Sequence, residues 1–292
     1  MSTEEIFETT IMNNINRKSV FVDNVELLDR TPLFSWIDIN VTELCNRTCV
    51  FCPRVDPEEY PNQNLQMSVA LAKKMADELI ELNYKGGVVF SGYGEPLLNP
   101  DLASIVKQFG ETIHTEIVTN GDPLNEKMIS ELYDSGLDML IVSLYDGPHQ
   151  IDEFKDLFSA VGIGEEKYVL RDRWYDIEED YGVKLTNRSG TVQVGNQQEV
   201  DPTKPCYYTH YSMMVDWNGD VNLCVQDWNK KVKFGNLHSN SLLEVWKSHN
   251  IEKYRRRLGK GLRNLEPCAQ CNVNGTLHGY NHADEWEKFR HR

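Results

Sequence analysis

The sequence has no long hydrophobic run and no export signal. No apolar stretch in the 292 residues approaches the roughly 18 to 20 residues that cross a bilayer. The first residues, MSTEEIFETTIMNN, are acidic and polar, so they lack the basic start and apolar core of a secretory signal peptide. We therefore expect a cytoplasmic protein with no membrane partner.

Positive charge is also scarce. The chain has 45 acidic and 30 basic residues, which gives a formal net charge of −15. A protein that binds the phosphate backbone of a nucleic acid normally has a basic face. The one basic cluster, at residues 254–263, lies in a helical-looking segment and is interpreted as a solvated face. We expect no nucleic-acid partner.

The seven cysteines are distributed unevenly, and three of them lie within TELCNRTCVFCPR, at Cys45, Cys49 and Cys52. In a reducing cytoplasm, thiols are more often ligands or buried apolar residues than disulfides. Three thiols cannot all pair in disulfides, and a tetrahedral zinc site wants four ligands. The pattern favours a centre that three thiolates hold with one position open. A zinc knuckle with a distant fourth ligand and purely structural thiols remain as alternatives.

Strand-like and helix-like segments alternate from residue 34 onwards. Strands are predicted at 34–40, 86–92, 115–121, 139–144, 167–172 and 183–187. Amphipathic helices are predicted at 68–83, with Ser68 as N-cap, and at 123–136, with Gly136 as the helix stop. About six strand-plus-helix units in this order predict an α/β fold whose parallel sheet forms a partial (β/α)6 barrel.

The pattern changes after about residue 190. Residues 212–224 are two short alternating runs joined by Asn218-Gly219, which is a strong hairpin signal. A helix is predicted at 241–258, and the tight turn EPCAQC follows it. We therefore predict an N-terminal extension (1–33), a partial barrel (34–190) and a small C-terminal domain of hairpin and helix (191–292).

The segment CNRTCVFC resembles the C-x3-C-x2-C signature of the radical S-adenosylmethionine (SAM) enzymes, including the aromatic Phe51 before the third cysteine. It follows the first predicted strand, at the end of a parallel barrel where active sites lie. The family's second motif, a glycine-glycine-glutamate loop after the second strand, resembles SGYGEP at 91–96. Gly94 and Glu95 match this motif, whereas Tyr93 replaces its first glycine. No clear G-x-I-x-G-x-x-E motif is present, so the adenine contacts stay unassigned.

This resemblance implies both cofactors and chemistry. Cys45, Cys49 and Cys52 would hold a [4Fe–4S] cluster whose open iron is chelated by the amine and carboxylate of SAM. Reductive cleavage of SAM then gives methionine and a 5′-deoxyadenosyl radical, which removes hydrogen from a substrate carbon. The expected SAM-binding residues are Phe51, Gly92, Tyr93, Gly94, Glu95, Asn120 and Ser143. Asn120 and Ser143 are equally compatible with ordinary turn positions.

The other four cysteines are Cys206, Cys224, Cys268 and Cys271. Their order resembles the auxiliary iron–sulfur domains called SPASM, and more closely the shortened twitch version with a single cluster. The resemblance implies a second [4Fe–4S] cluster that four thiolates ligate completely, with zinc as the alternative for any four-cysteine site. Such a cluster has no open iron for substrate, so its expected use is electron transfer.

All seven cysteines are then ligands, and no thiol is left over. Radical epimerases commonly quench the substrate radical with a cysteine thiol, which this chain lacks unless a tyrosine substitutes. The resemblance to the twitch dehydrogenases therefore implies an oxidoreductase that acts on a secondary alcohol of a small carbohydrate or aminocyclitol. The auxiliary cluster would accept the substrate's electron, and a flavodoxin or ferredoxin would supply the electron that starts the reaction.

Oxidation of an alcohol also needs a proton acceptor near the substrate carbon. Arg188, 18 residues before Cys206, is expected at the barrel mouth, where it would orient hydroxyls or accept the proton. Its high pKa makes arginine an unusual base. Asp227 is the conventional candidate, with Gln226 beside the auxiliary cluster. Tyr93 is expected to lean over the substrate.

Three other functions remain open at this point. A redox-neutral epimerase, dehydratase or lyase would use the same radical. A peptide-modifying enzyme is disfavoured because only 44 residues precede Cys45, whereas many such enzymes carry a longer recognition domain there. A scaffold with two structural metal sites would leave the GYGEP segment unexplained.

Overall fold

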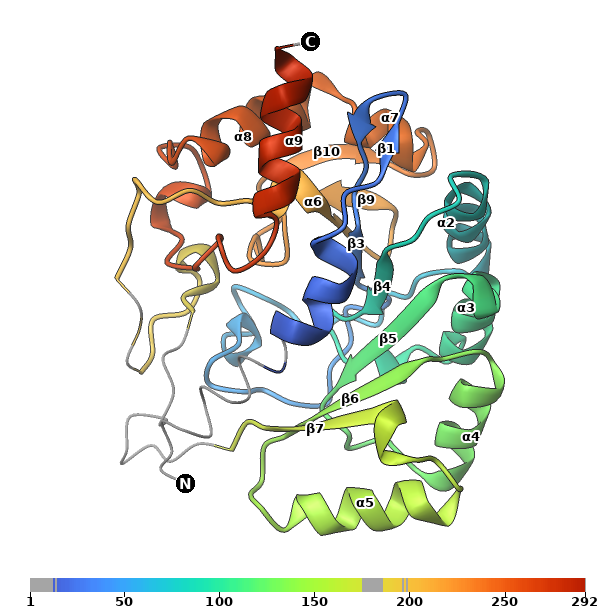
Figure 1. Cartoon of the computed structure of the whole chain (residues 1–292). Helices are drawn as coiled ribbons and strands as arrows, with labels where there is room; N and C mark the ends of the chain where they lie inside the picture. The colour runs from blue at the N-terminus through green and yellow to red at the C-terminus, as the bar shows by residue number, and fades with distance from the viewer. Residues whose placement is uncertain (1–12, 14, 175–185, 196, 198, 292) are drawn as a thin grey trace.

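The computed structural model describes residues 13, 15–174, 186–195, 197 and 199–291. Within this part of the chain, eight strands form one sheet in the order β10-β9-β8-β3-β4-β5-β6-β7 (Figure 1). Six neighbouring strands are parallel: β3 (Trp36–Ile39), β4 (Gly87–Phe90), β5 (His114–Thr119), β6 (Met139–Leu144), β7 (Tyr168–Asp172) and β8 (Ser212–Val215). The α/β fold class predicted from the sequence is confirmed.

Five of the six predicted parallel strands are present within two residues of their expected bounds. The sixth differs. Residues 183–185 lie outside the described residues, and 186 and 187 are not in a strand. The sixth parallel strand is instead β8, which pairs with β3 at the opposite edge, Trp36 facing Ser212 and Ile39 facing Val215. The short alternating run at 212–215 therefore serves both the barrel sheet and the hairpin.

Four helices connect the parallel strands: α2 (Val69–Glu81), α3 (Leu102–Phe109), α4 (Glu126–Asp134) and α5 (Gln150–Ala160). Ser68 is the predicted N-cap of α2, and its hydroxyl accepts a hydrogen bond from the amide of Leu71. Asn125 caps α4 in the same way through the amide of Met128. Figure 1 shows these helices together on one side of the sheet.

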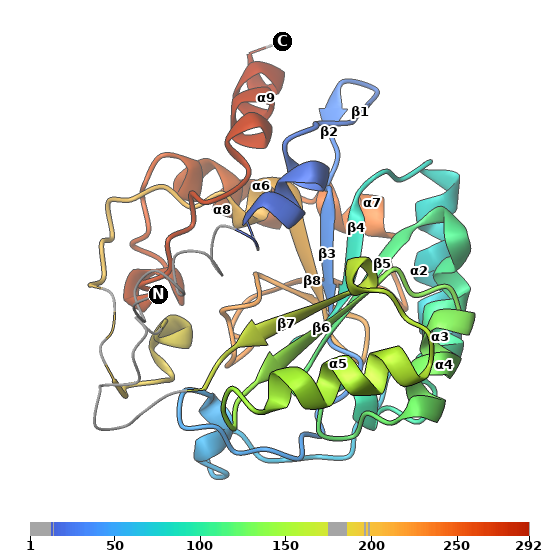
Figure 2. The same ribbon diagram turned by 60° about the horizontal axis from the view of Figure 1, so that its bottom comes forward.

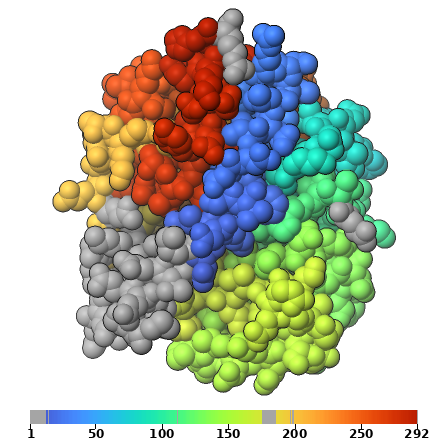
Figure 3. Space-filling model, viewed as in Figure 1, coloured from blue at the N-terminus to red at the C-terminus, as the bar shows by residue number. Residues whose placement is uncertain are grey.

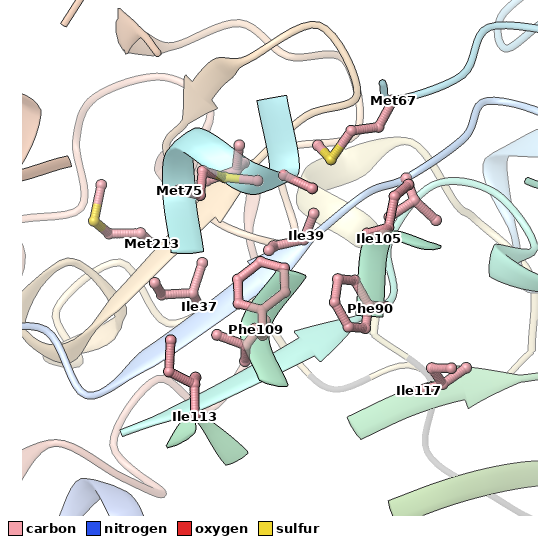
Figure 4. Close-up of a cluster of buried hydrophobic side chains, with 14 of the residues drawn as sticks. Ile37, Ile39, Met67, Met75, Phe90, Ile105, Phe109, Ile113, Ile117 and Met213 are labelled. Atoms are coloured by element: carbon pink, nitrogen blue, oxygen red, sulfur yellow. The ribbon is translucent and has the colours of Figure 1, made fainter. Parts of the chain in front are cut away.

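The main core fills the space between these helices and the sheet. Ile37 and Ile39 of β3 and Phe90 of β4 point towards the helices, where they meet Met75 and Phe109 (Figure 4). Their fractional exposure is at most 1%. The alternation of inward and outward residues along each strand places the intervening side chains on the other face of the sheet.

That other face is the inner side of the barrel. The N-terminal segment covers it at the end where strands β3 and β8 begin. Residues 15–22 are helical, and Val22 packs with Trp36, Val89 and Tyr211. The ammonium of Lys18 lies 4.6 Å from the centroid of the Trp36 ring. In Figure 3 this segment (blue) runs between the C-terminal residues (red) and the barrel strands (green).

The C-terminal part continues the same sheet. β9 (Asp220–Asn222) pairs antiparallel with β8, and Gly219 between them has a φ of +81°, which confirms the predicted Asn-Gly hairpin. β10 (Lys233–Asn236) adds a further antiparallel strand. The remaining helices and strands are α6 (Tyr208–Tyr211), α7 (Leu242–Trp246), α8 (His249–Gly259), α9 (Tyr280–Arg290), β1 (Leu27–Leu28) and β2 (Thr31–Pro32). Short 3-10 turns are η1 (Pro53–Val55), η2 (Pro96–Leu98), η3 (Gly110–Thr112), η4 (Glu165–Lys167), η6 (Arg188–Gly190) and η7 (Cys268–Gln270).

The prediction of one helix over 241–258 was wrong, because two helices occupy this segment. α7 ends at Trp246, and Ser248 begins α8 by accepting a hydrogen bond from the amide of Ile251. A serine in the middle of an amphipathic pattern acted here as a cap rather than as a surface residue. Across the described part of the chain, no helix combines the length and apolarity needed to cross a membrane.

The packing predicts which phenylalanine matters for stability. Phe109 is fully buried and meets the edge of Phe90 at a centroid distance of 5.5 Å. We expect Phe109→Ala to lower the free energy of unfolding by about 3–5 kcal/mol, because it leaves a cavity between α3 and the sheet. Phe289→Ala is the matched control, since Phe289 is 37% exposed. Urea denaturation that finds equal losses for both variants would contradict this prediction.

Candidate active site

The loop that follows β3 brings Cys45, Cys49 and Cys52 together at the carboxyl end of the barrel. The amide of Cys52 donates to the carbonyl of Cys49 at 2.9 Å, and the turn η1 follows directly. The pKa of the Cys49 thiol is raised to about 12, mainly by burial and to a smaller extent by the neighbouring Cys52 and Cys45. The three half-buried thiols of this loop thus lie close enough together to affect the pKa of Cys49. In Figure 2 the arrowheads of β6 and β7 point towards this loop (light blue).

Arg47, between the first two of these cysteines, fixes the loop to two neighbouring strand ends. Its guanidinium pairs with Asp122 after β5, Nε to Oδ2 at 2.7 Å, and with Asp146 after β6, Nη1 to Oδ1 at 2.9 Å. This contact lowers the pKa of Asp146. The predicted residue Asn120 donates to Asn46 Oδ1 at 2.8 Å, so its side chain also holds the loop. Phe51 lies 5.7 Å from Tyr145, centroid to centroid.

The segment SGYGEP lies directly against the cysteine loop. Gly94 has no room for a side chain, because a Cβ there would fall on the carbonyl oxygen of Thr42. The amides of Tyr93 and Gly94 both donate to Asn40 Oδ1, at 3.0 and 3.2 Å. The amide of Glu95 donates to the carbonyl of Leu44 at 2.8 Å. The residues that follow β3 therefore hold residues 91–96, which we call the SAM loop after the role that the resemblance predicts for it.

Glu95, expected among the SAM-binding residues, is 3% exposed and bonded within the protein. Its carboxylate accepts from Thr119 Oγ1 at 2.7 Å, from the amide of Asn120 at 2.8 Å and from the amide of Leu97 at 3.1 Å. Burial raises its pKa to about 7, although these hydrogen bonds oppose the shift. In this arrangement Glu95 ties the SAM loop to the end of β5.

Tyr93 does not lean over an open site. It is 1% exposed and packs with Tyr60, Met214 and Trp228. Its hydroxyl donates to the carbonyl of Asp227 at 3.2 Å. This placement disfavours the catalytic role expected for the side chain, because contacts within the protein surround it.

Ser143 lies at the end of β6, as expected, and its hydroxyl accepts from Arg171 Nη2 at 3.1 Å. Arg171 was missed in the sequence, although an arginine inside a strand, directly after Val169 and Leu170, was a usable signal. Burial lowers its pKa to about 9. In the described part of the chain Nε of Arg171 has no hydrogen-bond partner. An unsatisfied buried donor at a barrel mouth suits the carboxylate of a ligand.

A polar network joins the two halves of the chain beneath the SAM loop. Glu43 Oε2 pairs with Arg54 Nη2 at 3.3 Å, and Oε1 of Glu43 accepts from Lys230 Nζ. Lys230 Nζ also lies 2.6 Å from Asp216 Oδ2. Asn40 Nδ2 donates to Asp216 Oδ1 at 2.8 Å and to Glu43 Oε1 at 3.2 Å. Arg54 Nε donates to the carbonyl of Tyr93 at 2.5 Å.

The four C-terminal thiols line one shared pocket. Its lining includes Cys206, Cys224, Cys268 and Cys271, together with Ser189, Tyr208 and Arg263. Arg263 holds the wall, since Nε donates to the carbonyl of Lys204 at 2.7 Å and Nη2 to that of Pro205 at 2.9 Å. Burial raises the pKa of Cys206 to about 11, and Arg263 opposes this shift.

The donor set fits an iron–sulfur cluster better than zinc. Zinc draws four thiolates to about 2.3 Å from one point. Among the described residues, no three cysteine, histidine or acidic side chains are arranged to hold a single metal ion. The four thiols instead line one shared pocket, and four thiolates around one pocket are the ligand set of a [4Fe–4S] cluster. The backbone amides of Tyr208 and Gln226 lower the pKa values of the Cys206 and Cys224 thiols, against the larger effect of burial.

Arg188 lies between the two groups of cysteines. Its charge lowers the pKa of the Cys52 thiol, against the larger effect of burial, and the next residue, Ser189, lines the four-thiol cavity. Arg188 and Ser189 have φ angles of +47° and +55°, a conformation that non-glycine residues adopt mainly where surrounding structure holds them.

The other two candidate catalytic residues, Asp227 and Gln226, differ in whether their side-chain oxygens are already hydrogen-bonded. The carboxylate of Asp227 accepts from the amides of Lys231 at 3.1 Å and Val232 at 3.0 Å, so it stabilises a turn. Gln226 is 5% exposed, and its Oε1 has no partner in the described residues. Gln226 therefore has an unused buried acceptor, whereas the carboxylate of Asp227 is already hydrogen-bonded within the protein.

Two family models match the chain. The radical SAM superfamily model matches residues 39–167, and SPASM, an iron–sulfur cluster-binding domain, matches residues 206–272. The S-adenosyl-L-methionine-dependent 2-deoxy-scyllo-inosamine dehydrogenase of Niallia circulans is 29% identical over 245 residues, 82% of this chain and 93% of that protein. GTP 3′,8-cyclase of Campylobacter jejuni is 32% identical over 117 residues, 38% of this chain and 34% of that protein.

Solved structures agree with these matches. The crystal structure of BtrN in complex with AdoMet and 2-DOIA superposes with a TM-score of 0.70 at 28% identity, covering 86% of this chain and 98% of that one. An open conformation of BtrN gives a TM-score of 0.60 at 26% identity, with coverage of 82% and 93%. The resemblance predicted from CNRTCVFC and SGYGEP is confirmed, and the two matched domains imply SAM and two iron–sulfur clusters as cofactors.

The pKa of Glu95 predicts a pH-dependent stability. Its folded pKa of about 7 lies above the ordinary 4.5, so the folded state binds a proton more tightly between these values. The resulting stabilisation is present below pH 4.5 and lost as the pH rises through 7. We expect wild type to lose on the order of 2–3 kcal/mol relative to Glu95→Gln between pH 5 and 8, measured by urea denaturation. The exposed Glu58→Gln is the control, and parallel profiles for all three proteins would refute the prediction.

Proposed function

The chain belongs to the radical SAM superfamily, and we propose that it oxidises a secondary alcohol of a carbohydrate-like or aminocyclitol substrate. The observation that carries the proposal is the single cavity lined by all four C-terminal thiols. Four protein ligands leave an auxiliary cluster no open iron, so its use is to accept an electron. The similarity to a 2-deoxy-scyllo-inosamine dehydrogenase supports the same reaction type and substrate class.

In this proposal Cys45, Cys49 and Cys52 hold the first cluster, and Cys206, Cys224, Cys268 and Cys271 hold the second. When bound, the cofactors supply the radical that removes a hydrogen atom from the substrate carbon and the acceptor for its second electron. The residues of this chain orient the reactants and stabilise the alkoxide, and the hydroxyl proton passes to solvent water.

The SAM loop and the ends of β6 and β7 are proposed to hold SAM. The carbonyls of the SAM loop would accept from the methionine ammonium, and Asn40 keeps that loop in shape through two hydrogen bonds. Arg171, oriented by Ser143, would donate its unused Nε to the methionine carboxylate. Phe51, Gly92 and Asn120 belong to the same proposed surface.

Arg188 is the proposed substrate-binding residue, because its turn stands between the two groups of thiols. Its guanidinium would donate to substrate hydroxyls and stabilise the alkoxide as the hydroxyl proton leaves. The acceptor oxygen of Gln226 would take a hydrogen bond from a second hydroxyl. Asp227 and Tyr93 contribute to the wall of the site in this proposal. A flavodoxin or ferredoxin in a reducing cytoplasm would donate the starting electron.

Metal analysis tests the proposal. Anaerobically reconstituted wild type should contain about eight irons and no zinc, and Cys268→Ala/Cys271→Ala should contain about four irons. The double variant should still cleave SAM, while oxidation of 2-deoxy-scyllo-inosamine or a related cyclitol should be lost. About four irons plus one zinc in wild type would refute the electron-acceptor role and favour redox-neutral chemistry.

Arg188→Gln tests the substrate-binding role. We expect substrate oxidation to fall by roughly 10²–10⁴, because the variant lacks the positive charge that stabilises the alkoxide. SAM cleavage measured as 5′-deoxyadenosine should continue, and both clusters should remain. Arg256→Gln, a change of an exposed arginine on α8, is the matched control. Unchanged oxidation in Arg188→Gln would exclude this role.

A further inference from the structure

Lys230 reaches three functional segments with one side chain. It lies in the loop after Cys224, yet its ammonium pairs with Glu43, between β3 and the first cysteine loop. The same ammonium lies 2.6 Å from Asp216, at the top of the β8–β9 hairpin. It is also 4.7 Å from the ring centroid of Tyr93 in the SAM loop. The two halves of the chain therefore meet at this residue.

The backbone of Lys230 is in a conformation that favours glycine. Its φ is +50°, and its amide donates to the carbonyl of Asp227 at 3.0 Å. Non-glycine residues persist in this region where the surroundings hold them, and such residues gather at functional sites. A glycine would suit the turn better. The side chain, rather than the backbone, therefore explains why a lysine stands here.

The charges around Lys230 explain why a positively charged side chain is needed at this position. Glu43 and Asp216 are 5% and 1% exposed, and they face two cations, Arg54 and Lys230. Without Lys230 the network holds one negative charge too many, and an uncompensated buried charge is strongly unfavourable. The excess would fall on the two carboxylates that orient Asn40.

Asn40 passes this effect to the SAM loop. Its Nδ2 donates to both carboxylates, while its Oδ1 accepts the amides of Tyr93 and Gly94. If the carboxylates move apart, the amide plane of Asn40 loses the contacts that define it. The two loop amides would then lose their acceptor.

We propose that Lys230 is a positioning residue that holds the SAM loop in register with the C-terminal half of the protein. This inference rests on the proposed function, because it assumes that residues 91–96 bind SAM. Lys230 touches neither a cysteine nor the unused donor of Arg171 in the contacts described above. Its loss should therefore loosen the SAM loop while both clusters stay in place.

Four variants test the proposal in the reconstituted full-length protein. Lys230→Met removes the charge, Lys230→Gly removes it and relaxes the backbone, and Lys230→Arg keeps it. Lys231→Met is the matched control, because Lys231 is the next residue, is exposed, and pairs at 3.4 Å with the exposed Glu266. All four should retain the iron content of wild type.

Amide hydrogen exchange without SAM is the first measurement. We expect peptides covering residues 91–98 to exchange at least about tenfold faster in Lys230→Met and Lys230→Gly than in wild type. Peptides from α2 should be unchanged. Lys230→Arg and Lys231→Met should exchange like wild type throughout.

Equilibrium binding of SAM to the same proteins is the second measurement. The Kd for SAM should rise about tenfold in Lys230→Met and Lys230→Gly, and stay within about threefold of wild type in the other two. A wild type that binds no SAM would refute the proposed function rather than this inference. Wild-type binding with unchanged exchange and affinity in Lys230→Gly would overturn the inference. If Lys230→Met fails to fold, a Lys230→Arg variant with weakened SAM binding and fast loop exchange would overturn it equally.

Discussion

The buried pairing of Glu43 and Asp216 with Arg54 and Lys230 is the interaction on which the rest of the site depends. Two carboxylates almost excluded from water are stable as ions only if each has a cation and further hydrogen-bond donors. Removing one partner of such a pair typically costs about 3–5 kcal/mol, so none of these segments can move independently at low cost. Because the four charges come from the end of β3, the cysteine loop, the hairpin and the loop after Cys224, they fix the first cysteine centre relative to the second.

This fixed geometry constrains the chemistry. The Arg188–Ser189 turn, which links the two centres, is held in a left-handed conformation with Ser189 in the wall of the four-thiol cavity. A substrate beside Arg188 would face the SAM-binding end of the barrel on one side and the auxiliary cavity on the other. The proposed oxidation, which passes a hydrogen atom one way and an electron the other, would use this arrangement. Residues 15–22 pack against Trp36 and Tyr211, at the end of the barrel opposite the cysteine loop.

Hydrophobic alternation and cysteine spacing predicted most of the fold and the residues that gather at the two centres. Runs such as GGVVFSG have few ways to bury both faces except in a parallel sheet, so five strands were found close to their expected positions. The place of 212–215 in the parallel sheet was not predicted, because this run also reads as one arm of a hairpin and only its pairing with β3 reveals the second role. The contacts between particular side chains could not be predicted either. Glu95 and Thr119, or Lys230 and Glu43, are far apart in sequence, and spacing carries no information about which side chains meet across the fold. Arg171 was overlooked because an arginine in a buried strand conflicts with the local pattern, and such conflicts mark functional positions.

The thiols themselves show that the protein is arranged for bound clusters rather than for free cysteine. Burial raises the pKa values of Cys45, Cys52, Cys206 and Cys224, so without metal these thiols are protonated and neutral. Yet the backbone amides of Arg47, Arg54, Tyr208 and Gln226 lower the pKa values of these four thiols, which means that they favour a sulfur that carries negative charge. A site built only to bury thiols gains little from these donors. Cluster binding removes the protons, restores the charge on sulfur and makes full use of the amides, and hydrogen bonds to sulfur are among the factors that set a cluster's reduction potential. The same backbone that folds the two cysteine loops therefore also tunes the centres that they would hold.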